Sequence, residues 1–276
     1  ALNSEASREV MQLPSEVRAR MALQELGPTF VKMGQVLATR PDIFPPNWIE
    51  ELSKLQDQVP PVPFEEMLPG LQEALGKSPF EVFRDFDTTP VAGASIAQVY
   101  QAKLQDGTPV ILKLRRPGIQ ENIDADLRLL HHIARLIEAE VEEAKRFKPT
   151  EIVDQFSKSL KRELDLALEG RNTERFARNF LNDKTTSFAR IYWDYTSESV
   201  LVMEKIDGIP GNSLQEARQA GMDLPLLAAR GADAVMKMVL IDGFFHADPH
   251  PGNIFFLPEN KIAVIDCGMV GRISID

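Results

Sequence analysis

The segment 246–253 constrains the fold more than any other part of the chain. It reads His-Ala-Asp-Pro-His-Pro-Gly-Asn, and Asp266 follows thirteen residues after its last residue, Asn253. Two apolar, strand-like runs lie between these polar residues, and a Pro-Glu-Asn turn separates the runs. Such a hairpin returns the chain to its starting point. We therefore expect Asp248, Asn253 and Asp266 to converge at one end of the hairpin 254–265.

The three converging side chains are those needed for phosphoryl transfer, and their order is typical of kinase-like folds. Asp248 can accept a hydroxyl proton, while Asn253 and Asp266 can hold the metal that bridges nucleotide phosphates. Magnesium prefers hard oxygen ligands and keeps water and phosphate in its shell, so one amide oxygen and one carboxylate suffice. The alternative is an ordinary surface loop before a buried hairpin, and the unusual composition of the loop argues against it.

Composition limits the other functions that the chain can have. Its 276 residues allow two lobes, and contents of 43% hydrophobic and 26% charged residues are ordinary for a soluble globular protein. A net charge of −10 argues against general nucleic-acid binding. The single cysteine, Cys267, excludes an internal disulfide framework and a cysteine-cluster zinc site. We see no signal peptide and no run of roughly 18 apolar residues, and we expect a piece of a longer protein.

Three segments follow from proline placement and hydrophobic periodicity. Residues 1–84 are predicted to be a helical extension, 85–206 a lobe with strands and two long helices, and 207–276 a partial second lobe. The expected elements are strands at 96–100, 109–112, 189–193, 199–203, 254–256 and 262–265, with helices over 123–141, 152–168 and 224–241.

Lys113 ends an apolar strand and resembles the phosphate-contacting lysine of kinases. An ammonium group directed inward needs a carboxylate partner, because an unpaired buried charge is costly. On one continuous helix Asp165 and Glu169 would share a face, whereas Glu163 would point elsewhere. Two carboxylates on one face repel unless a lysine or a metal lies between them. The alternative for Lys113 is a solvated strand end.

A loop with a single glycine stands where a glycine-rich phosphate loop is expected. Its backbone amides can still cradle phosphate, although alanine makes the loop stiffer. The candidate contacts are Ala92, Gly93, Ala94 and Ser95. Alone, this loop could be any small-residue turn. The segment 203–208 looks like a hinge that meets adenine through Glu204 and Ile206.

Together these motifs resemble the UbiB-like atypical kinases, the ubiquinone-biosynthesis kinase-like ATPases. The matching motifs are Lys32-Met33-Gly34-Gln35, the alanine-rich loop at 92–95, Glu163-Leu164-Asp165, and the two loops that carry Asp248 and Asp266. The resemblance extends from about Leu26 to Ile273.

The resemblance implies an α+β, two-lobed protein-kinase-like fold with a helical amino-terminal Lys-x-Gly-Gln extension and a truncated carboxy-terminal lobe. It pairs Lys32 with Glu163 or Asp165, and Lys113 with Glu169. It also implies ATP and Mg²⁺ as cofactors, ATP hydrolysis that supports ubiquinone biosynthesis, and no phosphorylation of proteins in trans. Quinone-biosynthesis enzymes and a lipid or membrane surface would be partners, in the cytoplasm at the inner membrane.

The chain departs from the family pattern at three positions. Gly93 interrupts the alanine run, Ala97 stands where glycine is common, and Cys267 replaces the phenylalanine of the Asp-Phe-Gly motif. The default interpretation of Cys267 is a buried thiol, with a redox sensor as the alternative. For His246 and His250 we expect hydrogen bonds that orient the loop, with zinc ligation as the alternative.

Two other functions stay open. An aminoglycoside- or choline-kinase-like phosphotransferase has a similar catalytic loop, but the Lys-x-Gly-Gln segment argues against it. The second is a non-catalytic scaffold that binds nucleotide as a conformational ligand.

Overall fold

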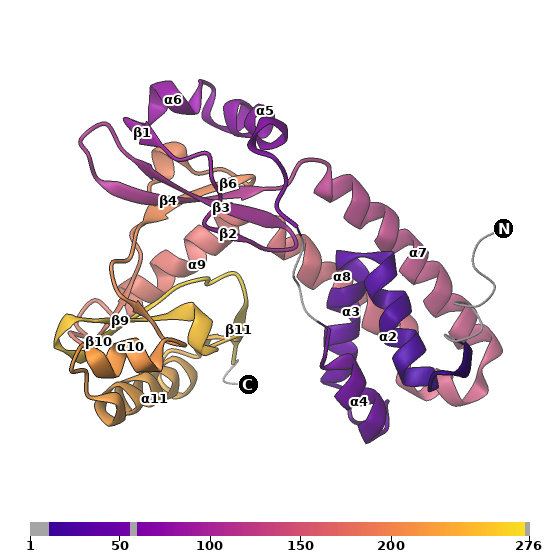
Figure 1. Ribbon diagram of the computed structural model, residues 1–276. Helices are drawn as coiled ribbons and strands as arrows, with labels where there is room; N and C mark the ends of the chain where they lie inside the picture. Colours follow the sequence, from indigo (N-terminus) through magenta and orange to yellow (C-terminus); the bar gives the residue numbers. More distant parts are fainter. Residues whose placement is uncertain (1–10, 56–59, 274–276) are drawn as a thin grey trace. The chain divides into compact units, whose positions relative to one another are not determined.

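The computed structural model describes residues 11–55 and 60–273, which group into two compact units (Figure 1). Unit 1 contains residues 1–61, 93–96 and 117–161, and unit 2 contains residues 62–92, 97–116 and 162–276. Each unit has its own hydrophobic core, so each is described by itself.

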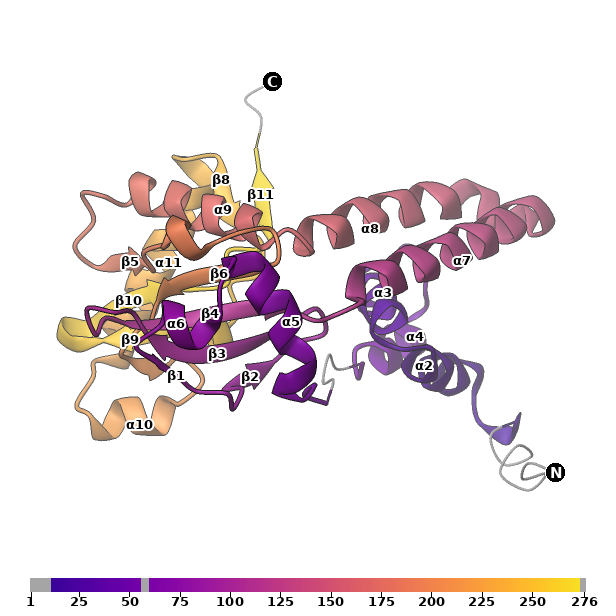
Figure 2. The ribbon, with the colours of Figure 1, turned by 90° about the horizontal axis from the view of Figure 1, so that it is seen from above.

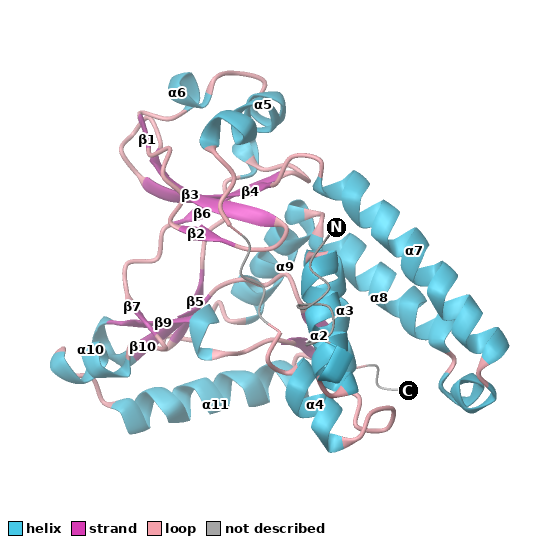
Figure 3. Ribbon diagram, turned by 45° about the vertical axis from the view of Figure 1, so that its right-hand side comes forward, coloured by secondary structure: helices cyan, strands magenta, loops and turns pink. Residues whose placement is uncertain are grey.

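The described residues of unit 1 within 11–55 and 117–161 are mainly helical, as Figure 3 shows. Its elements are α2 (Ser15–Leu26), α3 (Pro28–Ala38), α4 (Pro46–Leu52), α7 (Ile119–Glu140), the 3₁₀ helix η1 (Glu142–Phe147) and α8 (Pro149–Glu163), whose last two residues belong to unit 2. Proline opens α3, α4 and α8, where its missing N–H costs no helical hydrogen bond.

The glycine of the Lys-x-Gly-Gln motif is required by packing. A Cβ at Gly34 would lie 2.3 Å from a side-chain carbon of Leu55, so α3 can approach the α4 side only without a side chain there. Gln35 donates to the Leu55 carbonyl over 3.2 Å, and Val31, Leu52 and Leu55 form the small core beneath. The motif is therefore also a structural element of unit 1.

Helices α7 and α8 run side by side (Figures 1 and 2). His131 of α7 lies 2.8 Å from Asp154 of α8, and Glu138 accepts a hydrogen bond from the Thr150 amide at the start of α8. The apolar stripe predicted for α8 is buried at Phe156 and Leu160. The stripe predicted over 123–141 is buried only in its first part, because Ile133, Ile137 and Val141 are exposed.

Unit 2 contains an antiparallel sheet with the order β1-β3-β4-β6, to which β2 adds by pairing with β3. Its strands are β1 (Asp85–Phe86), β2 (Ala92–Gly93, whose second residue belongs to unit 1), β3 (Ala97–Lys103), β4 (Pro109–Arg115) and β6 (Val200–Glu204). In β4, Val110, Leu112 and Leu114 face a core completed by α5 (Phe64–Leu75) and α6 (Pro79–Val82). Because successive side chains alternate between faces, Lys113 points away from that core.

The rest of unit 2 surrounds a second core that includes Phe176, Phe244 and Cys267. A four-stranded sheet has the order β5-β10-β9-β7, and β8 pairs with β11. The elements are α9 (Leu166–Asn179), β5 (Thr186–Phe188), the 3₁₀ helix η2 (Trp193–Tyr195), β7 (Ile209–Pro210), α10 (Leu214–Gln219), α11 (Leu224–Leu240), β8 (Phe244–His246), the 3₁₀ helix η3 (Pro251–Asn253), β9 (Ile254–Leu257), the 3₁₀ helix η4 (Pro258–Asn260), β10 (Lys261–Val264) and β11 (Val270–Arg272).

Two expected elements were wrong. The helix predicted over 152–168 is two helices, because Asp165 has an extended backbone and its carboxylate caps α9 by accepting from the Leu168 amide. The strand predicted over 189–193 contributes only an isolated bridge at Ile191, and the neighbouring strand is β5.

The packing units cut across the three segments expected from the sequence. Residues 62–92 pack with the sheet of unit 2, while 117–161 pack with the amino-terminal helices. Long-range burial of apolar faces decides this grouping, and chain order does not reveal it. Within the described residues, no helix has the length and hydrophobicity needed to cross a membrane.

Candidate active site

Lys113 lies at the centre of the candidate site in unit 2. Its Nζ is 2.8 Å from Glu169 Oε2 and 3.2 Å from Asp266 Oδ1. The three residues come from β4, from α9 and from the segment after β10. The structure thus brings together Lys113 and Asp266, which the sequence placed in one site, and gives Lys113 the carboxylate Glu169 that the resemblance assigned to it.

The two carboxylates differ in exposure. The side chain of Glu169 is 7% exposed, and that of Asp266 is 47% exposed. Glu169 is therefore an internal counter-ion, whereas Asp266 keeps an accessible face that can meet a ligand.

The charges around Lys113 shift the pKa values of Lys113 and Asp266. Burial alone would lower the pKa of Lys113, but the nearby charges of Glu169 and Asp266 outweigh burial and raise it, so the ammonium form is fixed. Burial would raise the pKa of Asp266, but Lys113 outweighs this effect and lowers it. Asp266 is therefore a carboxylate at neutral pH.

The hairpin register brings Asn253 beside Asp266. Ile254 pairs with Val264, and the Ile265 amide donates to the Asn253 carbonyl over 2.9 Å. Asp266 comes next and has φ of 55°, a left-handed conformation that is strained for a residue with a side chain. The register places Asn253 and Asp266 at the same end of the hairpin, and the convergence of their side chains with that of Asp248 on one metal stays a prediction.

His246 connects the two loops. The Asp248 amide donates to His246 Nδ1 over 3.1 Å, so the proton of the neutral ring is on Nε2. That nitrogen lies 3.2 Å from the Ile265 carbonyl and donates to it. The ring is only 4% exposed. His246 therefore holds the loop of Asp248 against the segment that precedes Asp266.

His250 caps η3 beside Asp248. Its Nδ1 accepts from the Gly252 amide over 3.0 Å, and its Nε2 is 3.6 Å from Asp248 Oδ2. A Cβ at Gly252 would lie 2.6 Å from the imidazole ring, so the cap requires glycine. The expectation that both histidines orient the loop by hydrogen bonds agrees with these contacts.

Sequence reasoning missed Asn172 on α9. Its side-chain amide donates to the Cys267 carbonyl over 3.0 Å, three residues after Glu169 on the same helix face. One face of α9 therefore holds both Lys113 and the loop of Asp266. Spacing from Glu169 was the signal that could have found it.

Cys267 is fully buried, and burial raises the pKa of its thiol to about 12. The reactive species of cysteine is the thiolate. The side chain is therefore a neutral packing group, and the redox-sensor alternative has no support here.

Asp165 has a structural role that the face-sharing prediction did not foresee. Besides capping α9, its carboxylate lies 2.8 Å from Arg171. Asp165 lies between α8 and α9 with an extended backbone, so Asp165 and Glu169 do not share a helix face. The prediction that they would share one was wrong. Lys32 belongs to unit 1, whereas Glu163 and Asp165 belong to unit 2, so the predicted pairing stays a prediction.

The nucleotide-loop residues are only partly placed. Ala92 lies in β2 of unit 2, while Gly93, Ala94 and Ser95 belong to unit 1. Their role over Lys113 therefore stays a prediction.

The segment predicted to be the hinge lies within unit 2. Glu204 ends β6, where its carboxylate accepts from the Arg190 amide over 3.1 Å. Ile206 follows in an irregular segment before β7. Adenine contact at Glu204 and Ile206 stays a prediction as well.

The donor set fits magnesium. The amide nitrogen of Asn253 donates to the Asp248 carbonyl over 3.1 Å, which leaves its amide oxygen as the ligand atom. That oxygen and the exposed carboxylate of Asp266 are the hard ligands that Mg²⁺ prefers. Within residues 11–55 and 60–273, no cluster of three or more His, Cys, Asp and Glu side chains has a geometry that could hold a metal.

Comparisons with known proteins identify the family of the chain. A family model described as the ABC1 atypical kinase-like domain matches residues 54–276. Proteins named "Probable protein kinase UbiB" are similar: that of Marinobacter nauticus is 43% identical over 94% of this chain and 48% of its own length. That of Azotobacter vinelandii is 41% identical over 97% and 50%, respectively. The chain thus spans about half the length of these relatives.

A solved structure is also similar. The Mycobacterium tuberculosis protein Rv3197, in complex with erythromycin, superposes with a TM-score of 0.68 and 27% identity, over 97% of this chain and 67% of that one. The expected mixed α and β, kinase-like fold is confirmed. The chain belongs to the family of ABC1 atypical kinase-like domains and is a relative of the UbiB proteins.

Proposed function

We propose that this chain carries the Mg·ATP centre of a UbiB-like ATPase that supports isoprenoid-quinone biosynthesis. The observation that carries the proposal is the convergence of Lys113, Glu169 and Asp266 beside the hairpin that holds Asn253. The names of the UbiB relatives support the biosynthetic role.

Each residue has a distinct role in this proposal. Glu169 positions the Lys113 ammonium to contact nucleotide phosphates, and Asn253 and Asp266 hold the metal. Bound Mg²⁺ would neutralise charge that develops on the phosphate oxygens. Asp248 accepts the proton of the attacking hydroxyl group or water, and His246 keeps its loop in place.

Hydrolysis of ATP is favoured here over phosphorylation of proteins in trans. By the resemblance, the Lys32–Gln35 segment would occupy the place where a protein substrate docks. The loop 92–95, Glu204 and Ile206 would complete nucleotide binding. Quinone-biosynthesis enzymes and a lipid or membrane surface are the proposed partners, and the inner face of the inner membrane is the proposed location.

One observation favours a second candidate. The similar Rv3197 protein was solved with erythromycin, a small molecule. A small-molecule phosphotransferase would transfer the phosphoryl group to such a ligand. Mass spectrometry of erythromycin, choline and an aminoglycoside after incubation with the protein and Mg·ATP distinguishes this activity from hydrolysis.

The proposed function is tested by Asp266→Asn. Calorimetric titration with ATP, with and without Mg²⁺, and phosphate release should show magnesium-dependent binding and activity in the wild type. The matched control is Asp233→Asn, an exposed carboxylate on α11. We expect Asp266→Asn alone to lose activity by about 100-fold or more. Undiminished phosphate release by Asp266→Asn would contradict the proposal.

A further inference from the structure

Asp266, the proposed metal ligand, has an uncommon backbone conformation. Its φ of 55° lies in the left-handed region, which residues with a Cβ enter rarely and at a cost in conformational energy. Such a conformation persists where the surrounding contacts fix the backbone on both sides of the residue. The contacts on either side of Asp266 therefore decide where its carboxylate points.

The residue before Asp266 is held at both of its backbone polar groups. The Ile265 amide donates to the Asn253 carbonyl over 2.9 Å, and the Ile265 carbonyl accepts from His246 Nε2 over 3.2 Å. His246 also accepts a hydrogen bond from the Asp248 amide. A variant of His246 would therefore disturb the loop of Asp248 as well as the segment before Asp266.

The residue after Asp266 is held from α9. Asn172 is 5% exposed, and its amide nitrogen donates over 3.0 Å to the carbonyl of Cys267, which lies 95 residues later in the chain. The Gly268 amide hydrogen-bonds to the Asp266 carboxylate, and a Cβ at Gly268 would lie 3.6 Å from Glu169 Oε2. The segment 266–268 therefore lies against α9, and Asn172 fixes its backbone there.

Helix α9 contacts both Lys113 and this segment. Glu169 Oε2 is 2.8 Å from Lys113 Nζ, and Asn172 follows three residues later on the same helix face. Because the helix is hydrogen-bonded along its backbone, Glu169 and Asn172 keep a constant separation. The helix thereby fixes the distance between Lys113 Nζ and Asp266 Oδ1, which is 3.2 Å.

We propose that Asn172 is a positioning residue for metal binding. Its hydrogen bond to the Cys267 carbonyl keeps Asp266 in the left-handed conformation, with its carboxylate at a fixed distance from Lys113. This inference rests on the proposed function, because it requires Asp266 to bind Mg²⁺ together with ATP. Residues that orient metal ligands through hydrogen bonds typically contribute about 10–100-fold to metal affinity.

Two variants of Asn172 remove the hydrogen bond in different ways. Asn172→Leu keeps a side chain of similar size but cannot donate, whereas Asn172→Ala removes most of the side chain. The matched control is Glu174→Ala on the same helix, which removes the acceptor of a 2.6 Å hydrogen bond from Trp193 Nε1. Each variant thus loses one hydrogen bond of α9, and circular dichroism of the whole chain checks that it folds.

Hydrogen exchange without metal or nucleotide measures the backbone directly. The peptide 264–270 contains the Ile265 and Gly268 amides, which are hydrogen-bonded in the structure. Loss of the Asn172 contact should make this peptide exchange about fivefold faster or more, because the segment opens more easily. Glu174→Ala should leave its exchange unchanged.

Calorimetric titration with ATP, in saturating Mg²⁺ and in EDTA, measures how much the metal strengthens ATP binding. In both Asn172 variants this gain in affinity should fall by about tenfold or more, while the affinity in EDTA stays within about twofold of the wild type. Glu174→Ala should keep the gain of the wild type. A general loss of stability would not act on the two titrations so differently.

The inference is overturned if the folded Asn172 variants keep the gain of the wild type, or if Glu174→Ala reduces the gain as strongly as they do. Unchanged exchange of the peptide 264–270 in both Asn172 variants also overturns it. If the wild type itself gains no affinity from Mg²⁺, the proposed function fails and this inference fails with it. The wild-type titration therefore distinguishes the two failures.

Discussion

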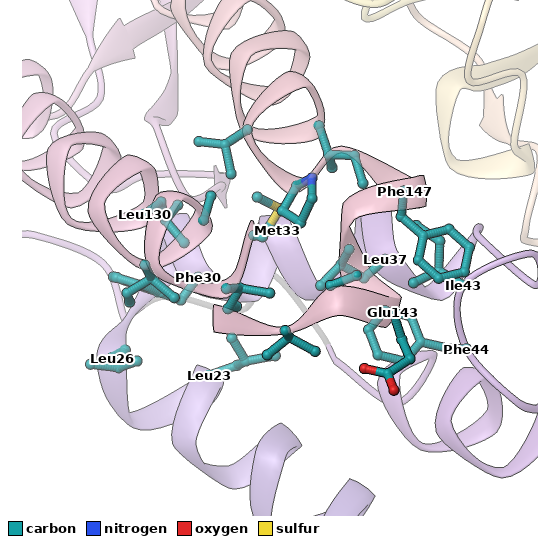
Figure 4. Close-up of a pocket in the computed structure, with 18 residues that line it drawn as sticks. Leu23, Leu26, Phe30, Met33, Leu37, Ile43, Phe44, Leu130, Glu143 and Phe147 are labelled. Atoms are coloured by element: carbon teal, nitrogen blue, oxygen red, sulfur yellow. The ribbon is translucent and has the colours of Figure 1, made fainter. Parts of the chain in front are cut away.

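The candidate site of unit 2 and an apolar cavity of unit 1, which lies among α2, α3, α7 and α8 (Figure 4), place polar groups in opposite ways. In unit 2 a lysine whose side chain is 17% exposed contacts two carboxylates within 3.2 Å, and hydrogen bonds fix the loops around them. In unit 1 the cavity wall has Glu143 as its one charged side chain. Hydrogen bonds and ion pairs are directional, whereas apolar burial is not. Unit 2 is therefore suited to orienting reacting atoms, whereas the apolar cavity wall of unit 1 offers no directional contacts.

The largest expected effect is a loss of ATPase rate that leaves unit 1 unchanged. Asp248→Asn removes the proton acceptor and should lower the ATPase rate by about 10²–10⁴-fold. Because Asp248 is neither metal ligand nor lysine partner in the proposal, nucleotide affinity should stay within about twofold. Phosphate release and calorimetry measure the two effects.

The same variant separates an enzyme from a scaffold. If the full-length parent protein with Asp248→Asn fully complements a quinone-deficient strain, catalysis is dispensable and the scaffold alternative is favoured. Failure of complementation with normal protein abundance supports the enzyme.

The next effect concerns the stability of unit 2. Lys113→Met leaves Glu169 buried without its ammonium partner and should lower the free energy of unfolding by about 3–5 kcal/mol. The double variant with Glu169→Gln should recover part of this loss, since no uncompensated charge remains. Denaturant unfolding of the four proteins gives the coupling energy, and a value near zero contradicts the role of Glu169 as counter-ion.

In unit 1 a larger side chain at the cavity should raise the stability, in contrast to the loss expected for Lys113→Met in unit 2. Ala134→Leu fills empty space and should raise the stability of unit 1 by about 0.5–2 kcal/mol. Leu52→Ala, at a core position that is 1% exposed, should lower it by about 2–5 kcal/mol. Scanning calorimetry without ligand measures both, and a loss of stability in Ala134→Leu contradicts a vacant cavity.

The smallest expected effect concerns the turn at Asp183, which leads into β5. Burial opposes ionisation of Asp183, but hydrogen bonds from Thr185 and Thr186 outweigh it and lower its pKa. The stabilisation is therefore present above the ordinary pKa of aspartate, about 3.9, and is lost as pH falls through the lowered value. Asp183→Ala should cost about 1–2 kcal/mol at neutral pH and much less at about pH 3.

Asp183→Asn is the control for that experiment. It keeps an oxygen that can accept the three hydrogen bonds of the turn but cannot ionise. Its stability relative to Asp183→Ala should change little between the two pH values. An equal pH dependence in both variants would assign the effect to another group.

Much of the hairpin that follows Asn253 could be predicted from the sequence, because its information is local. The strands 254–257 and 261–264, the turn between them and the meeting of Asn253 with Asp266 follow from alternation and turn residues. Helix α11 was found for the same reason, with Asp223 as its cap.

The errors arose where a single side chain or a distant contact decides the structure. Asp165 ends one helix and caps the next, although the apolar periodicity runs through it. Asn172 was missed although its spacing from Glu169 places both on one helix face, because its partner is a distant backbone carbonyl. The cavity of unit 1 joins helices about 100 residues apart in the chain, so periodicity showed each apolar stripe but not the space between them.

The contact between Gly252 and the ring of His250 limits how the loop 248–253 can change over evolutionary time. Any larger residue at 252 displaces the imidazole, whereas a small residue at 250 would leave room for it. Tolerated replacements at these two positions should therefore occur as pairs, and Gly252→Ala should be less harmful when combined with His250→Ser than when introduced alone.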